Sequence, residues 1–356
     1  MIDACAANEV ASVEDWKGRV AQRAGWGDPL EHTHPAPLHP SGSYYDMTCV
    51  HPQLRPLLEA ARGQPELADV SPSVARAQIA ARVASRPPGP RIDEVLDLEA
   101  PGPHGSIPLR LYRPKEPLGV AVAFHGGGWL MGNLDSFDAT CRHLANDSGL
   151  AIVSVDYRLA PEHRFPAAID DAWAATQWIA ANIKTLRLGN SDRIVVLGES
   201  AGGNLAAAVA LLARDAGAPK ICLQVLVYPA VDGRLECESL RQFAEGYLQT
   251  TRDVRYAWRN YGGTLAPASD WRLSPLLAPS HANVAPALII SAECDGTRDD
   301  SDAYTRRLLE SGVAATHVRY AGMIHTFFGM RGIVHDAEVA QKQAAEAMRS
   351  AVTRGL

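Results

Sequence analysis

The sequence has few of the features that mark secreted or membrane-spanning proteins. Its six cysteines never form a Cys-x-x-Cys pair, and its longest apolar run, at 205–213, is far shorter than the ~20 residues that span a bilayer. The first 25 residues carry four acidic side chains and no apolar core, so we expect no secretory signal. Together these absences predict a reduced, cytoplasmic protein without a membrane span.

Positive charge is also scarce. The 34 Lys and Arg residues are outnumbered by 40 Asp and Glu residues, which gives a net charge of −6, and no basic block occurs. Recognition of nucleic-acid phosphates needs a basic surface, so we expect no nucleic-acid partner. His32, His34 and His39 share one loop, but its four prolines and the lack of metal-ligand spacing argue against a metal site. No cofactor is expected.

The composition is that of a packed domain. Apolar residues make up 47% of the chain and charged residues 21%. A length of 356 residues suits one large α/β unit with an extra layer, or two domains. Residues 1–90 contain helix-like stretches at 12–24 and 52–62, a proline-rich loop and a stiff connector at 86–90, so we interpret them as an appended layer.

Residues 91–356 read as the main domain, because strand-like runs alternate there with helix-like runs. This pattern predicts a mostly parallel central sheet flanked by helices. The stretch 231–285, rich in aromatic and charged residues, interrupts the alternation and is a candidate lid. The predicted strands are 94–98, 107–112, 120–124, 151–155, 193–197, 221–228, 287–291 and 315–319, and the predicted helices are 136–146, 166–183, 201–213, 301–310 and 335–351.

A Gly-x-Ser-x-Gly pattern follows one of the predicted strands. Gly198, Ser200 and Gly202 lie where the strand turns into a helix, the context in which this pattern holds a nucleophilic serine. The flanking glycines let the turn lift the Ser200 hydroxyl clear of the sheet. The turn also directs the N–H of Ala201 and the helix N-terminus toward an oxyanion formed at the serine.

A second glycine-rich segment, His125–Trp129, follows the predicted strand 120–124. Three consecutive glycines allow the backbone to curl close to a ligand and to present two N–H groups. Such groups would complete an oxyanion hole beside Ser200.

A serine nucleophile needs a base, and the base needs an orienting carboxylate. In sheet proteins of this type the chain order is serine, acid, histidine. Asp295 and His325 each follow a late strand, at the sheet edge where open α/β sheets gather their sites. His317 and His335 fit less well, because one lies inside a strand and the other begins a helix. Two further acids compete with Asp295 in the same loop, at positions 299 and 300.

Five blocks in this order resemble the bacterial hormone-sensitive-lipase-like esterases, which are α/β-hydrolases. The blocks are 125–129, 156–163, 198–205, 292–295 and 322–328, and the resemblance covers residues 92–351. It implies an α/β-hydrolase fold with a helical cap made of residues 1–90 and 231–285, the second being a cap insertion. The chain departs from the family in two places: the loop after Asp295 lacks the usual proline, and Glu199 replaces the more usual aspartate before the serine.

For the site, the resemblance implies a serine carboxylesterase. Ser200 would be the nucleophile, His325 the base and Asp295 its partner. The N–H groups of Gly127, Gly128 and Ala201 would form the oxyanion hole. Aromatic residues are expected to line the acyl or alcohol pocket, and the candidates are Trp129, Tyr44, Tyr45 and Trp258.

The expected substrate is a small ester with a short- to medium-length acyl chain or an aryl group. An amidase or an acyltransferase with the same triad remains an alternative, as does a non-catalytic receptor of this fold. Receptors of this kind have lost the catalytic histidine, whereas this chain keeps His325. The resemblance also raises a homodimer as one oligomeric state.

Overall fold

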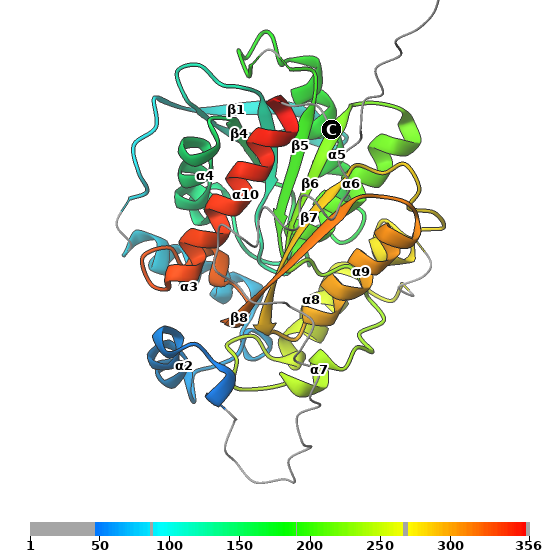
Figure 1. Ribbon diagram of the computed structural model, residues 1–356. Helices are drawn as coiled ribbons and strands as arrows, with labels where there is room; N and C mark the ends of the chain where they lie inside the picture. Colours follow the sequence, from blue (N-terminus) through cyan, green and yellow to red (C-terminus); the bar gives the residue numbers. More distant parts are fainter. Residues whose placement is uncertain (1–46, 86–87, 190, 266–269, 354–356) are drawn as a thin grey trace, which may run out of the picture. The chain divides into compact units, whose positions relative to one another are not determined.

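An eight-stranded sheet forms the centre of the part of the chain that the structure, a computed structural model, describes: residues 47–85, 88–189, 191–265 and 270–353 (Figure 1). The strands lie in the order β1-β2-β4-β3-β5-β6-β7-β8. β2 pairs antiparallel with β1 and β4, and all other neighbours pair in parallel, which confirms the predicted α/β class. The strands are β1 (Glu94–Gly102), β2 (Gly105–Arg113), β3 (Val120–Phe124), β4 (Ala151–Val155), β5 (Ile194–Glu199), β6 (Ile221–Val227), β7 (Ala287–Cys294) and β8 (Ala315–Ile324).

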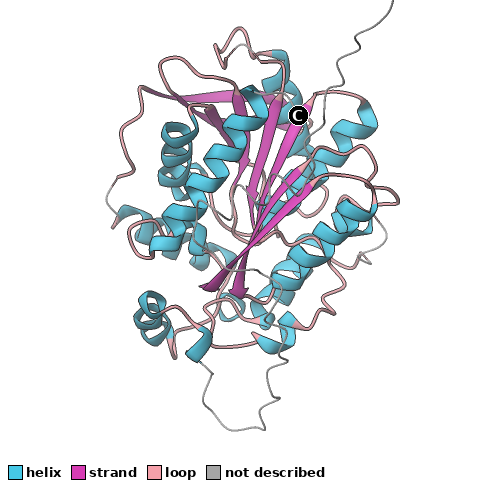
Figure 2. Ribbon diagram, viewed as in Figure 1, coloured by secondary structure: helices cyan, strands magenta, loops and turns pink. Residues whose placement is uncertain are grey.

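Helices connect the parallel strands and extend before and after them (Figure 2). Within the described residues, no helix combines the length and apolarity needed to cross a bilayer. The helices are α2 (Arg55–Ala61), α3 (Pro72–Ala84), α4 (Leu134–Ser148), α5 (Ala167–Ala181), α6 (Ala201–Ala216), α7 (Ser239–Gln242), α8 (Thr251–Gly262), α9 (Arg298–Glu310) and α10 (His335–Thr353), with 3-10 turns η1 (Met47–Cys49), η2 (Pro52–Leu54), η3 (Leu67–Asp69), η4 (Pro275–Leu277) and η5 (Phe327–Gly329).

Both faces of the central strands β3 to β7 are buried, and alternate residues of each strand point to opposite sides. In β3, Val122 and Phe124 join the cluster beneath α5, α6 and α9, whereas Ala121 and Ala123 join the cluster beneath α4 and α10. A strand buried on both faces has no polar side to present. This explains why β3 to β7 are nearly continuous apolar runs, whereas the edge strand β1 alternates apolar with charged residues.

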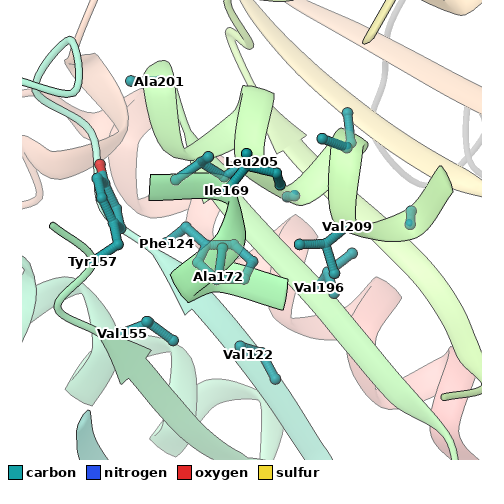
Figure 3. Packing of buried hydrophobic residues seen from close by; sticks show 14 of the residues in the cluster. Val122, Phe124, Val155, Tyr157, Ile169, Ala172, Val196, Ala201, Leu205 and Val209 are labelled. Atoms are coloured by element: carbon teal, nitrogen blue, oxygen red, sulfur yellow. The ribbon is translucent and has the colours of Figure 1, made fainter. Parts of the chain in front are cut away.

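Helix α6 is buried almost all round, as its sequence predicts. Its small residues bring it close to the sheet, and Leu205 lies in one cluster with Phe124 of β3 and Ile169 of α5 (Figure 3). All three side chains have no exposed surface. Burial of a side chain of this size contributes about 1.5–3 kcal/mol, so this packing fixes the helix that follows Ser200.

The sequence analysis missed helix α3, although two signals for it are present. Ser71 caps the helix by accepting a hydrogen bond from the N–H of Val74, and Pro72 occupies the first helical position. β8 also extends beyond the predicted end at 319, and α9 begins earlier than predicted. The predicted helix at 12–24 lies outside the described residues.

Arg76 fastens α3 to the loops that follow β3 and β4. Its Nε donates to the carbonyl oxygen of Leu130 at 2.7 Å, and its Nη2 donates to that of Ala160 at 2.8 Å. The guanidinium also binds both carboxylate oxygens of Glu162, at 3.0 and 2.7 Å. One side chain therefore ties α3 to the segment just after the glycine loop.

Replacing Arg76 by methionine is expected to lower the free energy of unfolding by about 1–3 kcal/mol, because two backbone carbonyls lose charged donors. Urea denaturation of the wild type and the variant measures the difference. Arg82→Met is the matched control, since Arg82 is an exposed residue on the same helix. Equal losses in both variants would show that the Arg76 hydrogen bonds contribute nothing of their own.

Candidate active site

The turn between β5 and α6 holds Ser200 in a strained conformation. Its φ of 56° and ψ of −116° lie where L-residues are seldom found. A Cβ on Gly198 would approach the carbonyl oxygen of Gly202 to 1.9 Å, and a Cβ on Gly202 would approach that of Phe124 to 2.0 Å. Glycine is therefore required at both positions, for the steric reason that the sequence pattern implies.

Three side chains from the ends of β5, β7 and β8 meet at this turn. Nε2 of His325 lies 2.9 Å from Oγ of Ser200, and Nδ1 of His325 lies 2.8 Å from Oδ2 of Asp295. The three residues are 7%, 2% and 1% exposed, in the order Ser200, His325, Asp295. The structure thus brings together the serine, histidine and acid that the sequence predicts, although they are far apart in the chain.

Thr297 orients the carboxylate of Asp295, a role that the sequence analysis did not identify. Its N–H and its hydroxyl both donate to Oδ1 of Asp295, at 2.8 and 3.0 Å, which leaves Oδ2 for the histidine. Thr297 stands in the loop where the family proline is missing. The local hydrogen bonds therefore hold the acid without that proline.

The two competing acids face away from the histidine. Oδ2 of Asp299 accepts from the N–H of Ser239 at 2.8 Å. Oδ2 of Asp300 accepts from the N–H groups of Val231 and Asp232, at 3.0 and 3.1 Å. Both carboxylates fasten the start of the 231–285 insertion to the N-terminal end of α9.

The glycine loop curls tightly after β3. Gly127 has φ +117° and Gly128 has φ +61°, and a Cβ on Gly127 would lie 2.2 Å from the carbonyl oxygen of Met131. In the described part of the chain, no backbone carbonyl oxygen accepts from the N–H of Gly127 or Gly128, and Ala201 is the first residue of α6, where a helix leaves its N–H groups unpaired. These three donors are available to an anionic oxygen, which is the chemistry of an oxyanion hole.

Tyr157 supports the base of this loop. Its hydroxyl donates to the carbonyl oxygen of His125 at 2.7 Å, and its ring stacks on the His125 ring at a centroid distance of 4.3 Å. Nδ1 of His125 donates to the carbonyl oxygen of Gly126 at 2.8 Å. Burial lowers the pKa of His125 to about 4, so the imidazole is neutral near pH 7.

Helix α8 of the insertion covers the other side of the loop. The ring of Trp129 stacks on Tyr261 at 4.4 Å and meets the edge of Trp258 at 4.8 Å. A Cβ on Gly128 would lie 2.9 Å from the Cβ of Ala257, so the helix also contacts the loop backbone. This packing leaves Trp129 only 1% exposed.

Of the residues predicted to line the pocket, Trp258 borders a cavity of about 230 Å³ within the insertion, together with Leu235 and Leu273. Trp129 does not line this cavity and is buried against Trp258, and Tyr44 and Tyr45 lie outside the described residues. Among the described residues, no group of three or more His, Cys, Asp or Glu side chains could hold a metal ion.

Asp156 lies 4.0 Å from Nε2 of His125, at the head of the block 156–163. Burial and the nearby Asp135 raise the pKa of its carboxyl to about 6, against the opposing effect of Arg110. The folded protein therefore binds the proton more tightly than the unfolded chain. This contribution to stability is complete below about pH 4 and is lost as the pH rises through 6.

The wild type is therefore expected to lose stability between pH 4 and pH 8, whereas Asp156→Asn is not. The free energy of unfolding of the variant, taken relative to that of the wild type, is expected to rise by about 1 kcal/mol over this range, a value that allows for solvent screening of the half-buried carboxyl. Guanidinium denaturation at both pH values measures it, with the exposed Glu116→Gln as the control. A difference that stays constant with pH would contradict the raised pKa.

Comparisons with known proteins agree with this geometry. Residues 121–329 match the model of a family with the alpha/beta hydrolase fold. Carboxylic ester hydrolase LipN of Mycobacterium tuberculosis is 40% identical over 279 residues, 75% of this chain and 73% of the relative. Ethyl acetate hydrolase of Pseudomonas putida is 37% identical over 68% of this chain and 78% of its own.

A solved structure extends the comparison to three dimensions. Ester-hydrolase EH1AB1 from the metagenome of Lake Arreo, in complex with a derivative of bipyridine phosphonate, superposes with a TM-score of 0.80. The two chains are 38% identical, and the match covers 85% of this chain and 98% of that one. The chain therefore belongs to the hormone-sensitive-lipase-like family of α/β-hydrolases.

Proposed function

We propose that the protein is a serine carboxylic ester hydrolase that acts on short- to medium-chain or aryl esters through an acyl-enzyme. The observation that carries the proposal is the hydrogen-bonded series Ser200–His325–Asp295 beside the N–H groups of Gly127, Gly128 and Ala201, for which the described residues provide no backbone acceptor. The names of LipN and ethyl acetate hydrolase support the ester bond as the target.

In the first half of the reaction, Oγ of Ser200 attacks the ester carbonyl carbon while Nε2 of His325 takes the hydroxyl proton. The carbonyl oxygen becomes an oxyanion and accepts hydrogen bonds from the N–H groups of Gly127, Gly128 and Ala201. Each such donor contributes roughly 2.7–4 kcal/mol to the transition state. The imidazolium then gives its proton to the alcohol oxygen as the carbon–oxygen bond breaks.

In the second half, a water molecule takes the place of the alcohol. His325 removes a proton from the water as its oxygen attacks the acyl carbon, and the proton then returns to Oγ of Ser200 as the acid leaves. Asp295 keeps Nδ1 of the imidazole protonated and stabilises the imidazolium in both halves. Thr297 holds the carboxylate in the orientation that this role needs.

We propose that residues 1–90 and 231–285 form the cap over the acyl pocket. The contacts of α3 and α8 with the loop after β3 support this arrangement, because both helices belong to these segments. The aromatic rings of α8 favour short acyl chains or aryl groups over long chains.

The expected partner is a small ester, and the net charge of −6 gives no support to a nucleic acid. A cytoplasmic location and a homodimer are further parts of the proposal. The location rests on the cysteines, which form no Cys-x-x-Cys pair, and the dimer on the resemblance to esterases that are often dimers.

Ser200→Ala is expected to lower the turnover of 4-nitrophenyl esters at least about 10³-fold, because the nucleophile is lost. A panel from acetate to palmitate measures turnover and chain-length preference together, and we expect the short and medium chains to be hydrolysed fastest. Ser106→Ala is the control, since Ser106 is exposed on β2.

Undiminished turnover in Ser200→Ala would overturn the proposed mechanism. A fluorophosphonate probe separates an esterase, which it labels, from a receptor, which it leaves unlabelled. Adding a competing alcohol to the assay distinguishes hydrolysis from acyl transfer by the ester product, and an anilide substrate tests for amidase activity.

The choice of acid gives a separate prediction. Asp295→Asn is expected to lower turnover about 10³–10⁴-fold, because the amide no longer fixes the imidazole tautomer or stabilises the imidazolium. Asp299→Asn keeps an oxygen that can accept from Ser239 and is expected to lose less than about tenfold. Steady-state kinetics on one ester measures both variants, and similar losses in the two would reject Asp295 as the partner of His325.

A further inference from the structure

A pair of thiols lies directly beside the loop of Asp295. Sγ of Cys294, the last residue of β7, is 3.2 Å from Sγ of Cys49, the last residue of η1. The two residues are 245 positions apart in the chain. In the described part of the chain, no other two cysteine sulfurs are in contact.

Backbone packing holds the Cys49 segment against the end of the sheet. The N–H of His51 donates to the carbonyl oxygen of Gly322 at 2.9 Å. Gly322 has φ +68°, and a Cβ there would lie 2.8 Å from the nitrogen of His51 and 3.1 Å from the carbonyl oxygen of Cys49. The N–H of Gly322 in turn donates to Glu293, the neighbour of Cys294, at 2.7 Å. The sulfur contact is therefore built into the docking of this segment on β7 and β8.

The two thiols differ in access to solvent. Cys49 is exposed, whereas Cys294 has no exposed surface. The hydrogen bond to Cys49 and burial raise the pKa of the Cys294 thiol well above its usual range, and the contribution of the Cys49 thiol is lost once Cys49 has entered a mixed disulfide. A dissolved oxidant therefore meets Cys49 first, and Cys294 is placed to react with Cys49 and not with the oxidant itself.

We propose that Cys49 and Cys294 form an oxidisable dithiol site whose oxidant is a small-molecule disulfide, such as glutathione disulfide. The thiolate of Cys49 attacks one sulfur of the oxidant, forms a mixed disulfide and releases one thiol. Cys294 then loses its proton and attacks Sγ of Cys49, which forms the protein disulfide and releases the second thiol. The two protein thiols lose two electrons and two protons, and the oxidant becomes two thiols.

The bond would join η1 to the sheet end that carries Asp295 and His325. A cross-link between positions so far apart removes much of the freedom of the unfolded chain, so oxidation should stabilise the fold. The sulfurs need to approach by only about 1 Å beyond their present contact to reach bonding distance. This site is independent of the proposed ester hydrolysis, since none of its atoms takes part in that reaction.

The test treats the purified full-length protein with glutathione disulfide at pH 8.5. Peptide mapping without reductant is expected to show a Cys49–Cys294 cross-linked peptide that is two hydrogens lighter than the sum of its reduced parts. The melting temperature of the oxidised protein is expected to rise by about 5 °C and to return after dithiothreitol.

Cys49→Ser removes the exposed thiol and is expected to lose both the cross-link and the rise in melting temperature. Cys237→Ser is the matched control and is expected to keep both, because its sulfur contacts Ser239 and Gly296. A lasting glutathione adduct on Cys49 without the cross-link would overturn the proposal. A rise in melting temperature that persists in Cys49→Ser would overturn it equally.

Discussion

The strained backbone at Ser200 is the constraint on which the rest of the site depends. An L-residue holds this conformation only when its surroundings over-determine it. Here the neighbours of the turn are glycines without room for a side chain, and the helix that follows is buried under apolar side chains from β3 and α5. The hydrophobic packing of a mostly parallel sheet thus fixes the position of one hydroxyl group, and His325 and the N–H groups of the glycine loop are arranged around it.

The sequence was enough to predict the sheet, the five helices α4, α5, α6, α9 and α10, and the residues that meet at the sheet edge. Each of these has a local signal: apolar runs for buried strands, glycines for tight turns, and chain order for Asp295 and His325. The resemblance of the block 292–295 favoured Asp295 over Asp299 and Asp300, but the sequence offered no physical reason to exclude the other two. Only the fold shows that the last two carboxylates point to backbone N–H groups of the insertion.

What sequence reasoning missed depends on contacts between distant parts of the chain. In the sequence, Arg76 looks like one more basic residue until its partners, Leu130, Ala160 and Glu162, are known. Thr297 reads as a loop residue until its two hydrogen bonds to Asp295 are seen. Long side chains and hydroxyl groups can form hydrogen bonds with many different partners. Which partner they have is therefore decided by the tertiary structure and not by their spacing in the sequence.

The packing of α8 against the glycine loop has a consequence for attempts to redesign this protein. Ala257 touches the loop backbone at Gly128, and the rings of Trp258 and Tyr261 enclose Trp129 from the same helix. If the proposed cap and oxyanion hole are as described above, one helix affects both the acyl pocket and the N–H groups that bind the reacting oxygen. A substitution on α8 made to admit a bulkier acyl chain is then expected to shift those N–H groups as well, so broader specificity would come with slower chemistry unless the loop is repacked at the same time.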